Sequence, residues 1–368
     1  MIRFFRRLNR YVPKASILFF MIGIVAAVVY LVCIFSSAFA DFINVYISSV
    51  FRALNAHLTA WIPFSLAEFI ILSAPVTVIC VVVQMTRRSL RGRRYFIRCV
   101  TGLLSVVVLI GSMFVFTFGA GYRVPTLDRK LGIVREKVSA EELAATMEIV
   151  IDHLNELVPQ IIYAEGTGSV RPYSHKDTVA LCLDSYAALS EKYPFIQKLN
   201  APVKQIMLSE YMTYTHISGV YTFFTGEANL NTNYPYFVNV YTTAHEMAHQ
   251  RGIARENEAN FLAYLVCIGS DDPYMQYAGY LNMYEYLASP LYSASPSLYS
   301  KTVEKVDQRV RYDLFCYSEF FDKYRDNAAA EVSDAVNNTY LVLQGTEGSK
   351  SYGMVVDLAV AYHLRENP

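Results

Sequence analysis

Three long apolar runs dominate the first third of the chain. Ala15 to Ala40 carries no charge, Trp61 to Met85 carries only Glu68, and Cys99 to Ala120 is again uncharged. Each run is long enough to cross a hydrocarbon core of about 30 Å as a helix of about 20 residues. A buried helix of a soluble domain would show a polar stripe, which these runs lack. The pattern predicts three transmembrane helices, over about 15–38, 61–84 and 97–119.

Positive charges flank these runs unevenly. Cations precede the first run and fill the loop between the second and third, whereas the other loop, Asp41 to Ala60, holds only Arg52. Cytoplasmic loops of membrane proteins are rich in lysine and arginine, so the N-terminus is expected in the cytoplasm. Three crossings then place everything after about Gly121 outside the cytoplasmic membrane. The cations that carry this argument are Arg3, Arg6, Arg7, Arg10 and Lys14, followed by Arg87, Arg88, Arg91, Arg93, Arg94 and Arg98.

Two features of the membrane part leave alternatives open. Ala38-Phe-Ala40 resembles a signal-peptidase site, but the apolar stretch before it exceeds the usual core of about 7–15 residues, which favours a retained anchor. Cleavage there would not change the side on which the later residues lie. Glu68 is either a functional intramembrane acid or a carboxylate that reaches water near the outer end of its span.

Residues 121–368 are long enough for one domain with its own core. Ser139-Ala-Glu-Glu142 is a capping box that starts a helix, and a second helix is expected from Asp177 to Lys192. Residues 160–176 contain helix breakers and predict a loop. Ser218 to Gly226 is rich in β-branched and aromatic residues, which indicates a strand or hairpin. With a mainly helical stretch after Asp271, the pattern predicts a mainly α (α+β) domain outside the membrane, after a membrane anchor of residues 1–120.

Composition narrows the possible partners. Hydrophobic residues make up 54% of the chain and charged residues 17%, with a net charge of zero. Because the arginines are explained by the membrane, no basic stripe remains for a nucleic acid, and membrane lipid is the expected surrounding. The six cysteines form no C-x-x-C pair, so they predict no second metal site.

The candidate chemistry lies in His245-Glu246-x-x-His249, within the stretch from Thr243 to Gly252. Two histidines four residues apart on a helix project from one face, where both imidazoles can bind one Zn²⁺. Glu246 is placed to take a proton from water bound to that zinc, as a zinc peptidase requires. Thr243 is expected to cap this helix, and Gly252 to end it.

A third ligand is expected just downstream, because two imidazoles alone leave the geometry of zinc undefined. Glu256 and Asn260 share one face of the next helix, whereas Glu258 points about 200° away. Glu256 is therefore the expected third ligand and Asn260 its hydrogen-bonding partner. Glu258 stays an alternate ligand, because helix starts are poorly located from sequence.

Family resemblances support this interpretation. The segment Glu256-x-x-Ala259-Asn260 resembles the element that supplies the third ligand in several gluzincin metallopeptidases. Thr243 to Leu265, Thr225-Gly-Glu-Ala-Asn229 and Ser351-Tyr-Gly-Met-Val-Val-Asp357 together resemble a bacterial membrane family known as domain of unknown function 3810. These resemblances imply a membrane-anchored zinc peptidase with a zincin-like domain, without naming a substrate. The spacing departs from usual gluzincins, since only six residues separate His249 from Glu256.

The expected function is hydrolysis of protein or peptide substrates at the outer face of the cytoplasmic membrane, in the cell envelope. Glu246 would act as general base, and Tyr352 or His216 is a candidate for stabilising the oxyanion. Two alternatives stay open: a zinc-binding pseudo-enzyme that recognises envelope components, and a non-peptidase zinc hydrolase that acts on them. The upstream strand would either pair with an extended peptide or serve as an ordinary core strand.

Overall fold

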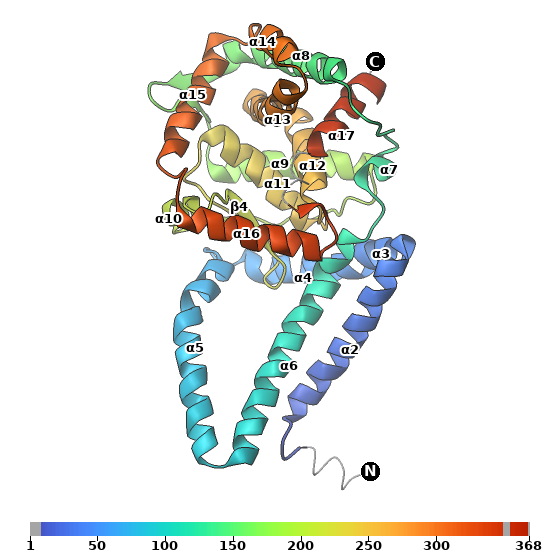
Figure 1. The fold of residues 1–368 in the computed structure, drawn as a ribbon, viewed down its shortest axis with the longest axis vertical. Helices are drawn as coiled ribbons and strands as arrows, with labels where there is room; N and C mark the ends of the chain where they lie inside the picture. Colours follow the sequence, from blue (N-terminus) through green and yellow to red (C-terminus); the bar gives the residue numbers. More distant parts are fainter. Residues whose placement is uncertain (1–8, 349–353, 367–368) are drawn as a thin grey trace. The chain divides into compact units, whose positions relative to one another are not determined.

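The computed structural model describes residues 9–348 and 354–366, and it is mostly helical with two small sheets (Figure 1). The chain divides into two compact units. The first contains the residues up to Val124 together with Thr222–Gly226, and the second contains Pro125–Tyr221 and the residues from Glu227 onward.

Three helices of the first unit are long and apolar enough to cross a membrane: α2 (Lys14–Phe35), α5 (Leu66–Leu90) and α6 (Arg93–Thr117). The prediction of three spans is confirmed at this level, although α5 begins five residues later than expected. Glu68 consequently lies in the first turn of α5, where a helix dipole favours a negative charge. Helix α2 packs against α6 so closely that a Cβ on Gly23 would collide with Cγ1 of Val108.

The segment that connects the first two spans is helical. It forms α3 (Ser37–Phe42), a π-helix (Ile43–Ser48) and α4 (Ser49–Ala60). The reason lies in Arg52, which is 1% exposed and must satisfy its donors internally. Its guanidinium donates to Asn44 Oδ1 at 2.9 Å and to the carbonyl oxygen of Thr117 at 3.0 Å. These bonds stabilise a compact helical fold for this segment.

The segment Thr222–Gly226 is distant in sequence from the rest of the first unit but packs within it. The side-chain amide of Asn55 donates to the carbonyl oxygen of Phe223 at 3.4 Å, and the Thr59 hydroxyl donates to that of Thr225 at 3.2 Å. The ring of Phe223 packs edge-on against that of Phe114, with 5.3 Å between centroids. The turn is therefore held by both polar and aromatic contacts.

The second unit surrounds the long helix α13 (Pro273–Ala294), which packs against α8, α11, α12 and α14 (Figure 1). The predicted capping box at Ser139 is confirmed at the start of α8, and α9 covers the second predicted helix. Both are driven by buried apolar faces that meet one continuous core. Besides α13, the α-helices that the structure describes in this unit are α7 (Leu127–Leu131), α8 (Ala140–Leu157), α9 (His175–Lys192), α10 (Ser209–Thr213), α11 (Tyr236–Gln250), α12 (Glu256–Ile268), α14 (Pro296–Val303), α15 (Gln308–Asp322), α16 (Ala328–Leu343) and α17 (Val355–Ala361).

Two small sheets complete the second unit. Strands β3 (Val203–Gln205), β5 (Glu227–Leu230) and β4 (Gly219–Thr222) lie in that order, with β3 parallel to β5, so β4 is an edge strand. The strand expected near residue 220 is thus confirmed. The loop expected over 160–176 instead contains an antiparallel pair, β1 (Ile162–Ala164) and β2 (Gly168–Val170), turned by Gly166 at φ +75°.

Candidate metal centre

Helix α11 carries both motif histidines but begins earlier than expected. It starts at Tyr236 after Pro235, and the Thr243 hydroxyl donates within the helix to the carbonyl oxygen of Asn239 at 2.7 Å. The prediction that Thr243 caps the helix was therefore wrong. Burial of Phe237 and Tyr241 in the core extends the helix by two turns at its start.

The end of α11 is confirmed. Gly252 adopts φ +89°, a left-handed conformation that residues with a Cβ avoid. Its N–H donates to the carbonyl oxygen of His249 at 2.9 Å, and the N–H of Ile253 donates to that of Ala248 at 3.2 Å. This turn reverses the chain so that α12 begins at Glu256, close to the histidines.

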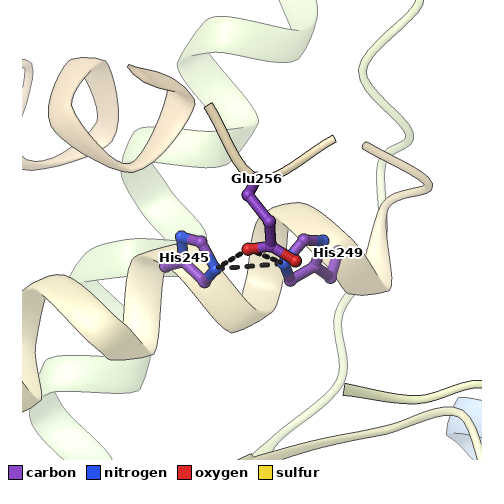
Figure 2. Close-up of side chains that lie close together, drawn as sticks. All are labelled: His245, His249 and Glu256. Atoms are coloured by element: carbon purple, nitrogen blue, oxygen red, sulfur yellow. Dashed lines mark hydrogen bonds and ion pairs between the residues drawn. The ribbon is translucent and has the colours of Figure 1, made fainter. Parts of the chain in front are cut away.

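His245, His249 and Glu256 converge on one point (Figure 2). The two Nε2 atoms lie 3.0 Å apart, and Oε2 of Glu256 lies 3.3 Å from Nε2 of His245 and 3.4 Å from that of His249. Zn–ligand bonds of 2.0–2.1 Å at a tetrahedral angle would separate donor atoms by roughly 3.3 Å. The three side chains thus match the donor set and spacing of a tetrahedral zinc site.

The surroundings orient these side chains. Nδ1 of His249 donates to the carbonyl oxygen of Ile253 at 2.7 Å, which directs Nε2 toward the centre. Burial alone would lower the pKa of His249, but Glu256 and Glu246 together raise it to about 9. Burial would likewise raise the pKa of Glu256, but the two imidazoles hold it well below its usual range. The imidazoles and Glu256 therefore attract each other strongly when an imidazole is protonated. A metal cation bound between them would replace that proton.

Glu246 lies beside this centre with 4% exposure. Burial raises the pKa of Glu246 to about 7. The nearby imidazoles and a hydrogen bond from the backbone N–H of Tyr221 oppose this rise. Its Oε2 is buried and accepts no hydrogen bond from the part of the chain that the structure describes. A carboxylate with one uncommitted oxygen and a pKa near neutrality is suited to accept and return a proton.

Strand β4 approaches Glu246 at a glycine. A Cβ on Gly219 would lie 2.7 Å from Oε1 of Glu246 and 2.6 Å from Cγ2 of Thr242. Only a residue without a side chain allows this edge strand to pass so close to the carboxylate. The sequence provides no local signal for this contact, because it depends on the packing of β4 against α11.

The structure separates Glu258 from the histidines. Its Oε1 accepts bonds from the N–H of Leu127 at 3.0 Å and from Nη1 of Arg255 at 2.7 Å. Asn260 is buried, and its Nδ2 donates to no described residue; its backbone carbonyl oxygen accepts from the Tyr241 hydroxyl at 2.7 Å. Glu256 is therefore the acid that meets both imidazoles, and the expected role of Asn260 stays a prediction.

The oxyanion-stabilising role expected of His216 or Tyr352 stays a prediction, and the sequence missed one residue near Glu256. The ring of His216 bonds to the carbonyl oxygen of Tyr324 at 2.6 Å, and Tyr352 lies outside the described residues. The missed residue is Tyr286, on α13. Burial raises the pKa of Tyr286, and the negative charges of Glu285 and Glu256 raise it further, so Tyr286 lies close to Glu256. Nothing in the local sequence around Tyr286 indicates this position.

The fold and the site therefore define a helical protein with three apolar helices, long enough to span a membrane, and a His-His-Glu cluster in its second unit. Residues 39–360 match the family described as "Protein of unknown function (DUF3810)", and the chain belongs to this family. Comparisons with curated proteins and with solved structures give no match.

Proposed function

We propose that this protein is a membrane-anchored zinc peptidase that hydrolyses peptide bonds at the outer face of the cytoplasmic membrane. The observation that carries the proposal is the convergence of His245, His249 and Glu256 at zinc-ligand spacing, with Glu246 beside them. These three residues would hold Zn²⁺. When bound, the ion would polarise a scissile carbonyl and lower the pKa of a water molecule toward about 7.

Glu246 would handle the proton. Oε2, which accepts no bond from a described residue, would take the proton from the attacking water and later deliver one to the leaving amine nitrogen. This carboxylate favours an enzyme over a pseudo-enzyme, because a site that only holds zinc for shape has no use for it.

Strand β4 would orient the substrate. As the edge strand of its sheet, it can pair with an extended peptide, and Gly219 brings that edge against Glu246. This arrangement supports peptide-bond hydrolysis over hydrolysis of a non-peptide envelope component. Pairing of a peptide backbone with β4 would hold a scissile bond at a constant distance from the proton acceptor.

The excess of arginine before α2 and between α5 and α6 supports an orientation with the N-terminus in the cytoplasm. Three crossings then put the second unit outside. Protease treatment of intact spheroplasts should degrade this unit while the α5–α6 loop stays protected. The reverse pattern would contradict the external location.

The function is tested by comparing cleavage products in native membranes that carry the wild-type protein or Glu246→Gln. The wild type should generate new peptide termini that the variant fails to generate, although both bind zinc. His249→Ala should lose both zinc and activity. Equal product sets from wild type and Glu246→Gln would reject the peptidase function.

A further inference from the structure

Glu285, on α13, is an acid that the proposed reaction does not use. In the described part of the chain its carboxylate takes part in no hydrogen bond and no ion pair. The side chain nevertheless reaches solvent-accessible space, since Glu285 is half-buried while Leu281 and Leu287 on the same helix are fully buried. An isolated carboxylate in such a position lacks the cation that would offset its desolvation.

The position of Glu285 follows from two contacts of α13 with α11. Nδ2 of Asn282 lies 3.5 Å from the carbonyl oxygen of Phe237, and the rings of Tyr286 and Tyr241 are 6.3 Å apart. Glu285 lies about 60° from Asn282 and about 100° from Tyr286 around the helix, so it projects beside the face that meets α11. It therefore lies beside the stretch of α11 between Phe237 and Tyr241.

This stretch leads directly to the metal centre. His245 follows Tyr241 by one turn and Phe237 by two, so the level of α11 beside Glu285 lies about 6–12 Å along the helix axis from His245. An extended peptide advances about 3.3 Å per residue, so a substrate that runs along α11 would cover this axial rise with about two to four residues. Tyr286, the neighbour of Glu285, is itself near Glu256.

Three tyrosines lie near the carboxylate of Glu285. Tyr284 and Tyr286 flank it in sequence, and Tyr317 of α15 lies near enough to feel its charge. Tyr317 is held edge-on against Phe237, with 5.6 Å between ring centroids. Aromatic faces attract ammonium and guanidinium groups, and a carboxylate among them adds a direct ionic partner.

We infer that Glu285 and the neighbouring tyrosines form a binding subsite for a cationic group of the substrate, either a basic side chain or a free amino terminus. The inference rests on the proposed peptidase function and adds a specificity to it. A lysine or arginine about two to four residues from the scissile bond would pair with Glu285. A free amine at that distance would do the same.

Peptide binding to the full-length, zinc-loaded Glu246→Gln protein in detergent micelles tests this inference without requiring hydrolysis. Calorimetry would compare N-acetylated peptide amides that differ only in lysine or Nε-acetyl-lysine. A second pair, with neutral side chains, would compare a free with an acetylated amino terminus. At least one charged peptide should bind about tenfold or more tightly than its neutral partner, and which pair differs identifies the source of the cation.

A second substitution assigns the effect to Glu285. Glu285→Gln should reduce the preference to less than about twofold, and Glu285→Asp should retain part of it. The control is Glu319, an exposed acid on α15, and Glu319→Gln should leave the preference intact. Circular dichroism and zinc content would verify folding of each variant. Equal binding within both pairs, no binding of any peptide, or a preference that survives Glu285→Gln would overturn the subsite. A preference without cleavage by the wild type would reject only the peptidase function, whereas cleavage without a preference would reject only the subsite.

Discussion

At the scale of single residues, the close approach of Gly219 to Glu246 leads to a direct test. Gly219→Ala would place a methyl group 2.7 Å from Cγ and Oε1 of Glu246, so β4 or the carboxylate must move. We expect peptide hydrolysis to fall at least tenfold and the unfolding free energy to fall by about 1–3 kcal/mol. Both are measurable on purified protein, with zinc content as a check that the ligands stay in place.

The matched control is Gly111→Ala on α6, where a new Cβ would meet no atom within 4 Å. That variant should retain activity and stability. An active Gly219→Ala protein would show that β4 does not constrain Glu246.

Glu285 gives a second prediction at this scale. Burial among tyrosines raises its pKa from 4.5 to about 8, so the folded protein favours the protonated form. A raised carboxyl pKa contributes stability that is fully present below about pH 4.5 and is lost as pH rises to about 8. Glu285→Gln removes this dependence. The variant should therefore gain stability relative to the wild type as pH rises from about 5 to about 8.5, in thermal melts without peptide.

The gain should shrink when the charged peptide is added, because a bound cation stabilises the ionised carboxylate of the wild type. Parallel pH profiles for wild type and Glu285→Gln would contradict the half-buried, unpaired state of this acid.

At the scale of elements, the turn between α11 and α12 brings Glu256 to the two histidines. Gly252 adopts φ +89°, and an alanine there would cost about 1–2 kcal/mol. Because the turn sets where α12 begins, we expect Gly252→Ala to weaken zinc binding by about tenfold or more as well. Competition with a chromophoric chelator would measure the affinity.

Gly132→Ala separates the two effects, since Gly132 has φ +75° after α7 and an added Cβ there would meet no atom within 4 Å. It should lose similar stability yet bind zinc as tightly as the wild type. Equal zinc affinity in both variants would show that the turn does not position Glu256.

The same elements show how far the sequence could lead. The spacing of His245 and His249 and the helix face of Glu256 are local properties, so the amino-acid pattern alone predicts them. The start of α11 could not be predicted in this way, because burial of aromatic residues in the core lengthens this helix. Gly219 and Glu285 were missed for a related reason: their significance comes from contacts between elements far apart in sequence.

At the scale of the whole molecule, the proposed zinc binding would be linked to proton binding and to folding. Without a metal, His249 has a pKa raised to about 9, above its unfolded value near 6.5. This contribution to stability is fully present below about pH 6.5 and is lost as pH rises through about 9. The depressed pKa of Glu256 adds stability above about pH 4.5, which is lost as pH falls. The contribution of His249 and Glu256 to the stability of the metal-free second unit should thus be largest between about pH 4.5 and 6.5.

Zinc requires a neutral imidazole, so its binding must release a proton from His249 at about pH 7. The apparent affinity should therefore rise up to about tenfold per pH unit between about pH 6 and 8.5, with about one proton released per ion in calorimetry with two buffers. The rise in melting temperature caused by zinc should grow over the same range, because ligand binding stabilises the folded state in proportion to the logarithm of the affinity. Glu246→Gln should keep this linkage, while His249→Ala should lose it. A zinc affinity that is independent of pH over this range would mean that the imidazole of His249 is not a ligand, and the site proposed for the second unit would have to be abandoned.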